Sequence, residues 1–176
     1  MTPMGIKLER WLSGAKRVVV LCIGSRIRSD DAFGPVLADE LKGKVPTHVA
    51  VIDAGNVPEN YTGAMRRFKP THILMVDAAD MGLYPGEPRL FKAKEIEGVT
   101  LSTHSPSLKI VAAYLSKATG ARIALLAVQP ESLDFGEGLT KEVEKAAIAI
   151  AETLTEVLSI GKKRRTRTQR AYGLSA

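Results

Sequence analysis

The sequence predicts a three-layer α/β fold. We expect a mostly parallel, twisted sheet of about five strands, with one antiparallel edge strand and helices on both faces. Two observations predict it. Short apolar runs rich in β-branched residues, such as VVVLCIG, are typical of strands that are buried on both faces of a parallel sheet. These runs alternate with amphipathic stretches of helical spacing, which is the pattern of successive β-α-β units.

The first half of the chain alternates between predicted helices and strands. Strands are predicted over the apolar runs 17–24, 47–54 and 71–78. Helices are predicted within 5–15, from Gly34 to Gly43, and within 56–68. Pro35 is tolerated in the first turn of the second helix, because a first-turn N–H has no partner inside the helix. Gly43 and Pro46 end that helix.

The second half begins with a predicted edge strand. Residues 88–93, PRLFKA, are assigned to the sheet edge because Pro88 cannot donate a hydrogen bond to a central strand. LSTHSP is a predicted loop, with Ser105 as the N-cap and Pro106 as the first residue of the next helix. Residues 122–130 form another buried strand, and Thr140 caps a long final amphipathic helix.

Composition indicates one globular domain with a terminal extension. The chain has 176 residues, of which 45% are hydrophobic and 25% charged. Its only cysteine, Cys22, lies in an apolar run, so an intramolecular disulfide is excluded and a buried thiol is expected. The first sixteen residues contain charges throughout and no secretory apolar core. We therefore expect a cytoplasmic protein without a membrane anchor.

Positive charge is concentrated at the C-terminus. Residues 162–170, KKRRTRTQR, hold six Lys and Arg, and the remaining chain has 19 basic and 19 acidic residues. We predict a single domain over 1–160 and a basic, disordered tail over 161–176. A minor alternative is that the tail binds nucleic acid or an acidic partner.

Three side chains that can bind a metal follow apolar runs of the predicted sheet. Asp31 follows VVVLCIGSRIRSD, Asp77 ends HILMVD, and His104 follows LFKAKEIEGVTLST. Parallel strands end at one edge of an open α/β sheet, so these groups are expected to converge there. Two carboxylates and one imidazole can hold a divalent cation and leave positions open for substrate and water. The sequence therefore predicts a hydrolytic metal site.

Structural roles are open for each of these residues. Asp30 and Asp31 precede a predicted helix, where carboxylates can serve as caps. Asp77 could accept hydrogen bonds from neighbouring backbone amides, and His104 could be a surface residue. Asp77 is the most informative, because burying an unpaired carboxylate after an apolar run would be costly.

Other polar residues are assigned to supporting roles. Asp53 and Asp80 lie near the same predicted edge and could orient a ligand or accept hydrogen bonds. His48 and His72 start strands at the opposite edge and are interpreted as structural or surface residues. Arg26 occupies the middle glycine position of a dinucleotide loop, and no P-loop lysine or serine-nucleophile motif is present. No organic cofactor is expected.

Five fragments, in order along the chain, resemble the hydrogenase maturation endopeptidases. They are CIGSRIRSDDAFGP, VIDAGNVPEN, VDAADMGLYPGE, STHSP and VQP, within about residues 18–158. These enzymes process the large subunits of [NiFe] hydrogenases, and the similarity is to the branch serving formate-hydrogenlyase and energy-converting hydrogenases. The resemblance implies a nickel-recognising, aspartic-type endopeptidase that removes the C-terminal extension of the large-subunit precursor after nickel insertion.

The resemblance also assigns residues. The family's two metal-contacting acids correspond to Asp31 and Asp77, and its histidine corresponds to His104, with nickel supplied by the substrate. Ser25 stands where the family often has asparagine, and Ala32 where it often has glycine, which affects fine specificity more than activity. The alternative is a non-enzymatic nickel-binding maturation chaperone that uses the same cluster.

Overall fold

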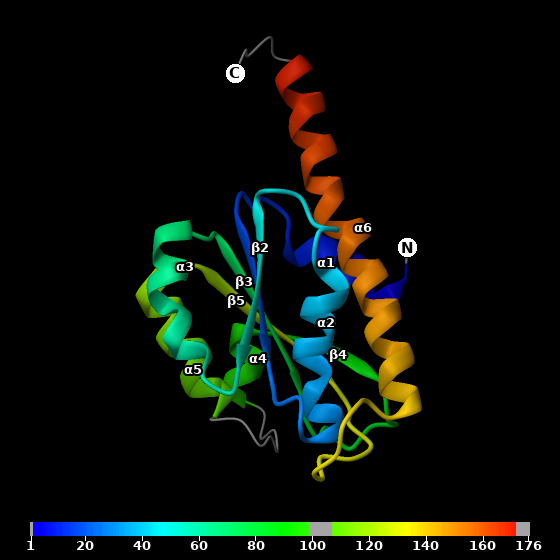
Figure 1. The fold of residues 1–176 in the computed structure, drawn as a ribbon. Helices are drawn as coiled ribbons and strands as arrows, with labels where there is room; N and C mark the ends of the chain where they lie inside the picture. Colours follow the sequence, from blue (N-terminus) through cyan, green and yellow to red (C-terminus); the bar gives the residue numbers. More distant parts are fainter. Residues whose placement is uncertain (1, 99–106, 172–176) are drawn as a thin grey trace.

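Five strands form one mixed sheet in the computed structural model, which describes residues 2–98 and 107–171 (Figure 1). The strands are β1 Val18–Ile23, β2 Val49–Gly55, β3 His72–Ala78, β4 Pro88–Lys92 and β5 Arg122–Val128. Their order is β2-β1-β3-β5-β4, and only the β4–β5 pair is antiparallel. The predicted α/β fold with one antiparallel edge strand is confirmed.

Helices cover both faces of the sheet. The α-helices are α1 Pro3–Trp11, α2 Phe33–Leu41, α3 Thr62–Phe68, α4 Ala93–Gly98, α5 Leu108–Thr119 and α6 Lys141–Ala171. Two 3₁₀ turns precede α2 and α3, namely η1 Ser29–Ala32 and η2 Pro58–Tyr61. One face carries α1, α2 and α6, and the other carries α3, α4 and α5 (Figure 1).

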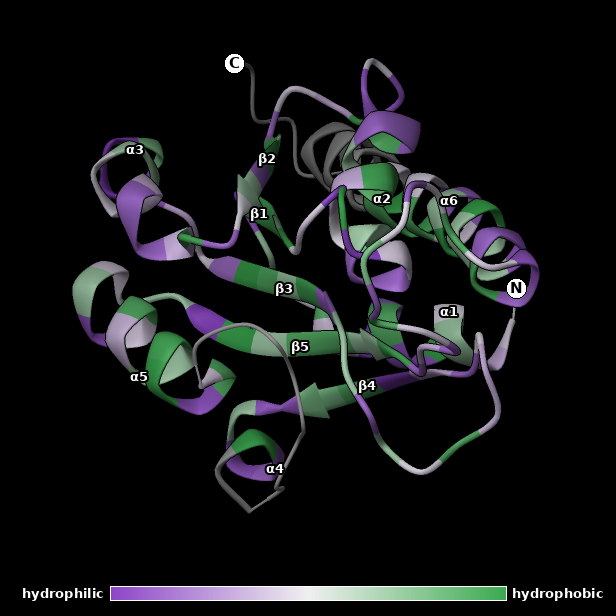
Figure 2. Cartoon of the chain, turned by 60° about the horizontal axis from the view of Figure 1, so that its bottom comes forward, coloured by the Kyte–Doolittle hydropathy of each residue, from purple (hydrophilic) through white to green (hydrophobic). Residues whose placement is uncertain are grey.

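Alternating side chains of the central strands build a separate core on each face. Val20 and Cys22 of β1 pack into the cluster under α1, α2 and α6, whereas Leu21 and Ile23 pack into the cluster under α3 and α5. In Figure 2 the hydrophobic β3 and β5 run between these helical layers. Burial raises the pKa of the Cys22 thiol, so this cysteine stays a neutral core side chain.

The two histidines at strand starts have structural surroundings. The His48 carbonyl accepts a hydrogen bond from the Val18 N–H at 3.0 Å. The His72 ring is 3% exposed, packs edge-on against Trp11 at 5.1 Å between centroids, and lies 3.0 Å from the Thr71 hydroxyl through Nδ1. Burial lowers the pKa of His72. Both residues lie at the amino ends of the strands, opposite the predicted site.

The segment before His104 differs from the prediction. Within the described part of the run 90–103, β4 ends at Lys92 and α4 follows it directly, so residues 93–98 are helical and not part of a buried strand. A local cap explains this helix, since the Lys92 N–H donates to the Glu95 carboxylate at 2.7 Å and Ile96 is buried against the core. After the gap, α5 begins at Leu108 with Ser107 as its N-cap. The predicted cap, Ser105, and Pro106 lie outside the described residues.

Helix α6 extends beyond the rest of the fold. It runs through Ala171, and its last turns protrude from the body in Figure 1. The backbone is helical as far as Ala171, and the disorder expected for the tail 161–176 stays a prediction. The division of the chain at residue 160 stays a prediction. Within 2–98 and 107–171, no helix combines the length and apolar character that crossing a bilayer requires.

Candidate functional site at the carboxyl edge of the sheet

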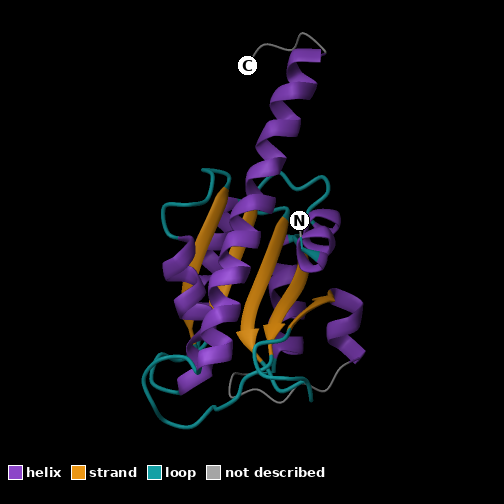
Figure 3. Ribbon diagram, turned by 90° about the vertical axis from the view of Figure 1, so that its right-hand side faces the viewer, coloured by secondary structure: helices purple, strands orange, loops and turns teal. Residues whose placement is uncertain are grey.

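The strands β1, β3 and β5 end at one edge of the sheet, where several loops gather (Figure 3). Strand β1 lies between β2 and β3, and the helices that follow β1 and β2 pack on opposite faces. The edge between β1 and β3 is therefore a topological switch point, the place where open α/β sheets form a crevice for ligands.

Asp31 lies in η1, directly after the loop that leaves β1. Asp31 is 1% exposed, and its Oδ2 accepts a hydrogen bond from the Ser25 N–H at 3.0 Å. The same N–H lies 3.1 Å from the Asp31 carbonyl oxygen. Ser25 therefore supports Asp31 through its backbone N–H, which any residue except proline could provide at position 25. The turn η1 also packs against β3.

Asp77 lies at the end of β3 and is fully buried. Its Oδ1 accepts a hydrogen bond from the Ala78 N–H at 2.9 Å. A purely structural role for Asp77 also predicts such a bond from a neighbouring backbone amide. In the sheet register Cys22 is opposite Val76, so Asp77 lies one residue farther, beside the end of β1. The fold therefore brings η1, which carries Asp31, against β3, which carries Asp77 near its end.

His104 lies outside the described residues, so its place relative to the two acids stays a prediction. Leu108, four residues later, starts α5 at the same edge, because α5 runs antiparallel to β5 before joining it. Among the described residues, no group of three His, Cys, Asp or Glu side chains is arranged to hold a metal ion. The structure therefore describes two of the three predicted ligands, Asp31 and Asp77.

Asp30 has a different role from its neighbour. This buried carboxylate accepts hydrogen bonds from the N–H groups of Glu131, Ser132 and Thr140 at 2.8, 3.1 and 2.7 Å. The Thr140 hydroxyl also donates to it, at 2.9 Å to Oδ2. Asp30 thus fastens the loop 131–140, and the N-cap position of α2 is held by Ala32 without a side-chain bond. Capping of α2 by Asp30 was a wrong alternative.

The guanidinium of Arg26 binds the carboxylate of Asp53. This guanidinium donates to the carboxylates of Asp39 and Asp53, each at 2.7 Å, and to the Pro35 carbonyl at 3.3 Å. The bond from Arg26 lowers the pKa of Asp39. These groups are partly exposed, so each pair adds little stability, but together they join the β1 loop to α2 and β2. Sequence analysis missed this role of Arg26.

The side-chain amide of Gln129 binds the carboxylate of Asp80. Its Oε1 accepts from the N–H groups of Met81 and Leu83 at 2.7 and 3.2 Å, and its Nε2 donates to Asp80 at 3.1 Å. The Gly82 N–H and Gln129 together lower the pKa of Asp80. Gln129 therefore shapes the loop after Asp77. In the sequence, the signal for this role is that Gln129, a polar residue, directly follows a buried strand.

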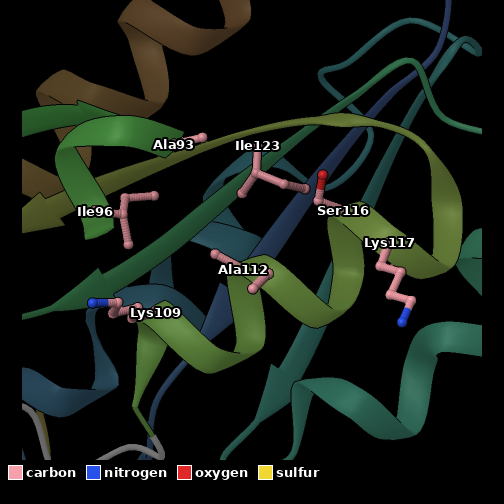
Figure 4. A pocket seen from close by; sticks show the side chains of 8 residues that line it. Ala93, Ile96, Lys109, Ala112, Ser116, Lys117 and Ile123 are labelled. Atoms are coloured by element: carbon pink, nitrogen blue, oxygen red, sulfur yellow. The ribbon is translucent and has the colours of Figure 1, made fainter. Parts of the chain in front are cut away.

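A separate cavity of about 490 Å³ lies between α4 and α5 (Figure 4). Its apolar lining includes Ile96, Ala112 and Ile123, and its polar lining consists of Lys109, Ser116 and Lys117. Neither Asp31 nor Asp77 lines it. Because this lining offers no carboxylate and no imidazole, the cavity does not match the predicted hydrolytic chemistry.

Two glycines permit the close packing of the loop that carries Asp31. Gly24 has φ +139°, and a Cβ there would lie 1.8 Å from the Asp31 carbonyl oxygen. A Cβ on Gly34 would lie 2.2 Å from the Ile23 carbonyl oxygen. These separations are too short for any side chain, so the loop can approach β1 only with glycine at both positions.

We expect Gly34→Ala to destabilise the protein by about 1–3 kcal/mol, because its methyl group would collide with the backbone of β1. Gly63→Ala is the matched control. Its Cβ would meet only the Arg67 side chain, at 3.5 Å, and alanine favours a helix by about 0.5–1 kcal/mol. Urea unfolding measures both changes, and equal stabilities for the two variants would contradict the packing argument.

Comparison with known proteins gives a consistent result. Residues 35–157 match the family model described as hydrogenase maturation protease. The chain is 34% identical over 137 residues to the hydrogenase 3 maturation protease of Escherichia coli K12, covering 77% of this chain and 87% of that protein.

Solved structures agree with the sequence relatives. The crystal structure of the [NiFe] hydrogenase maturation protease HycI from Thermococcus kodakarensis matches with a TM-score of 0.80 and 36% identity, covering 87% of this chain and 99% of that one. The solution structure of the endopeptidase HycI from Escherichia coli matches with a TM-score of 0.69 and 32% identity, covering 77% and 87%.

Proposed function

The chain belongs to the hydrogenase maturation protease family and is an endopeptidase, and we propose that it removes the C-terminal extension of a [NiFe] hydrogenase large-subunit precursor once nickel has been inserted. Family membership favours this activity over the nickel-binding chaperone. The structural support is that η1, which carries Asp31, packs against β3, which carries Asp77 near its end, at the switch point.

The proposed ligand set suits a metal that another protein already holds. Asp31 and Asp77 supply carboxylate oxygens, and His104 would supply a nitrogen. A set of this kind, without a thiolate, is expected to bind free nickel only moderately. Each acid already accepts a backbone N–H through one oxygen, which orients the carboxylate before substrate arrives. Recognition of the loaded precursor would then depend on the nickel in the precursor.

The chemistry follows from these side chains. Nickel in the substrate would polarise the scissile carbonyl or lower the pKa of a bound water. A carboxylate of Asp31 or Asp77 that is not fully committed to the metal can accept a proton from the attacking water. The surroundings of both acids are nearly free of solvent, which strengthens their interaction with a cation.

Nickel gating is the direct test. We expect the protein to cleave a nickel-loaded precursor and to leave the nickel-free precursor intact, because the metal completes the recognition. Mass spectrometry of both precursors after incubation with the protein measures the shortened product. The isolated protein should also bind nickel weakly in calorimetry. Equal cleavage of both precursors would refute the gating, and binding without a shorter product would restore the chaperone.

A further inference from the structure

Two large apolar side chains project into solvent beside the candidate acids. Ile27 is 60% exposed and Phe135 is 76% exposed. They come from the loop after β1 and the loop after β5, which lie at the same edge of the sheet. Single exposed apolar residues are ordinary, but two on adjoining loops next to a candidate site indicate a contact surface.

Hydrogen bonds hold the two loops together. The Ser29 N–H donates to the Gly136 carbonyl at 2.9 Å, and the Gly136 N–H donates to the Ile27 carbonyl at 3.0 Å. The Ser29 hydroxyl donates to the Asp134 carbonyl at 3.1 Å. Together with the bonds to Asp30, these contacts fix the loop that presents Phe135. The apolar groups are therefore exposed on a braced backbone, and little ordering is needed when a partner binds.

Arg28 supports the Phe135 ring. Its guanidinium carbon lies 4.6 Å from the ring centroid, a distance typical of a cation–π contact. Within the described residues, the buried Nε of Arg28 has no hydrogen-bond partner. The contact with the Phe135 ring therefore helps to place the Arg28 side chain, and the ring itself is 76% exposed.

The same short loop faces both inward and outward. Asp31 points into the fold, whereas Ile27, four residues earlier, is exposed. A protein chain brought to Asp31 therefore meets the loop that carries Ile27. An apolar contact of this kind would suit the folded part of a large protein substrate, because both side chains are exposed on hydrogen-bonded loops.

We propose that Ile27, Arg28 and Phe135, the docking lip, bind an apolar patch on the hydrogenase large-subunit precursor next to its cleavage site. This inference rests on the proposed function and names the residues that select its substrate. Ile27 and Phe135 supply apolar contact area, and Arg28 keeps the Phe135 ring in position. The docking lip determines affinity for the precursor, whereas Asp31 and Asp77 act on the bond.

Steady-state cleavage of nickel-loaded precursor tests the docking lip. We expect Phe135→Ala and Ile27→Ser each to raise KM about tenfold with kcat within about twofold, because a central apolar anchor at an interface contributes a factor of this size. Phe135→Leu keeps an apolar side chain and should retain KM within about threefold. Ile6→Ala, at a 49% exposed isoleucine on α1, is the control and should match the wild type.

The outcomes separate the two proposals. Unchanged KM in both Phe135→Ala and Ile27→Ser, with wild-type melting temperatures, would overturn the docking lip and leave the proposed function standing. A fall in kcat with no change in KM would also overturn it, because the residues would then act on chemistry or folding. Failure of the wild type to cleave the precursor would overturn the proposed function and the docking lip with it.

Discussion

Replacing Asp77 by asparagine is expected to abolish cleavage of the nickel-loaded precursor while the protein remains folded. The substitution keeps the size of the side chain and its bond from the Ala78 N–H, but removes the negative charge. A neutral amide can neither accept the proton of the attacking water nor attract the cation, and losing a general base costs about 10²–10⁴-fold in rate. Asp31→Asn should have a comparable effect for the same reason.

Initial rates from mass spectrometry, together with circular dichroism, measure this prediction. Asp80→Asn is the control, because Asp80 is an exposed residue and an asparagine Oδ1 can still accept the hydrogen bonds from the Gly82 N–H and Gln129 Nε2. Its rate should stay within a few fold of the wild type. Wild-type cleavage by Asp77→Asn or Asp31→Asn would remove that residue from the mechanism. His104→Ala extends the same test to the third predicted residue.

The neighbouring acid should behave in the opposite way. Asp30→Ala is expected to lower the free energy of unfolding by about 3–5 kcal/mol, since it leaves four part-buried donors without their charged acceptor. These donors are the N–H groups of Glu131, Ser132 and Thr140 and the Thr140 hydroxyl. Because those bonds hold the loop 131–140, the substitution should also loosen the docking lip.

Chemical denaturation of the purified variants measures this loss. Asp134→Ala, an exposed acid on the same loop, serves as the control and should change stability by less than about 0.5 kcal/mol. A loss below about 1 kcal/mol for Asp30→Ala would mean that the loop does not depend on this carboxylate. Together with Asp31→Asn, the experiment separates a structural acid from a candidate catalytic acid at successive positions.

The strands were accessible to prediction because their signal is local. The apolar runs that form β1, β3 and β5 are nearly continuous and are buried apart from Arg122, which is typical of strands in the middle of a parallel sheet. Their alternation with helices determines the parallel sheet, and Asp77 at a strand end follows directly. Helix α4 was missed, because a six-residue helix has too few residues to show a period.

The roles of individual polar residues were not accessible in this way. Asp30 and Asp31 are neighbours with the same chemistry, and nothing local distinguishes them. The partners of Asp30 lie 101 to 110 residues farther along the chain. Those of Arg26 and Gln129 are likewise remote in sequence. A hydrogen bond across such separations depends on how the loops meet in space, which no periodicity records.

By itself, the sequence determined the layered α/β architecture, the strand ends that carry Asp31 and Asp77, and the resemblance to the hydrogenase maturation endopeptidases. Hydrophobic periodicity and residue order along the chain contain that information. Only the tertiary structure decided that Asp30 braces a loop, that Arg26 binds Asp53 and Gln129 binds Asp80, and that the loops carrying Ile27 and Phe135 are hydrogen-bonded to each other. These arrangements arise because folding brings remote backbone donors and acceptors within bonding distance, where burial requires each of them to find a partner.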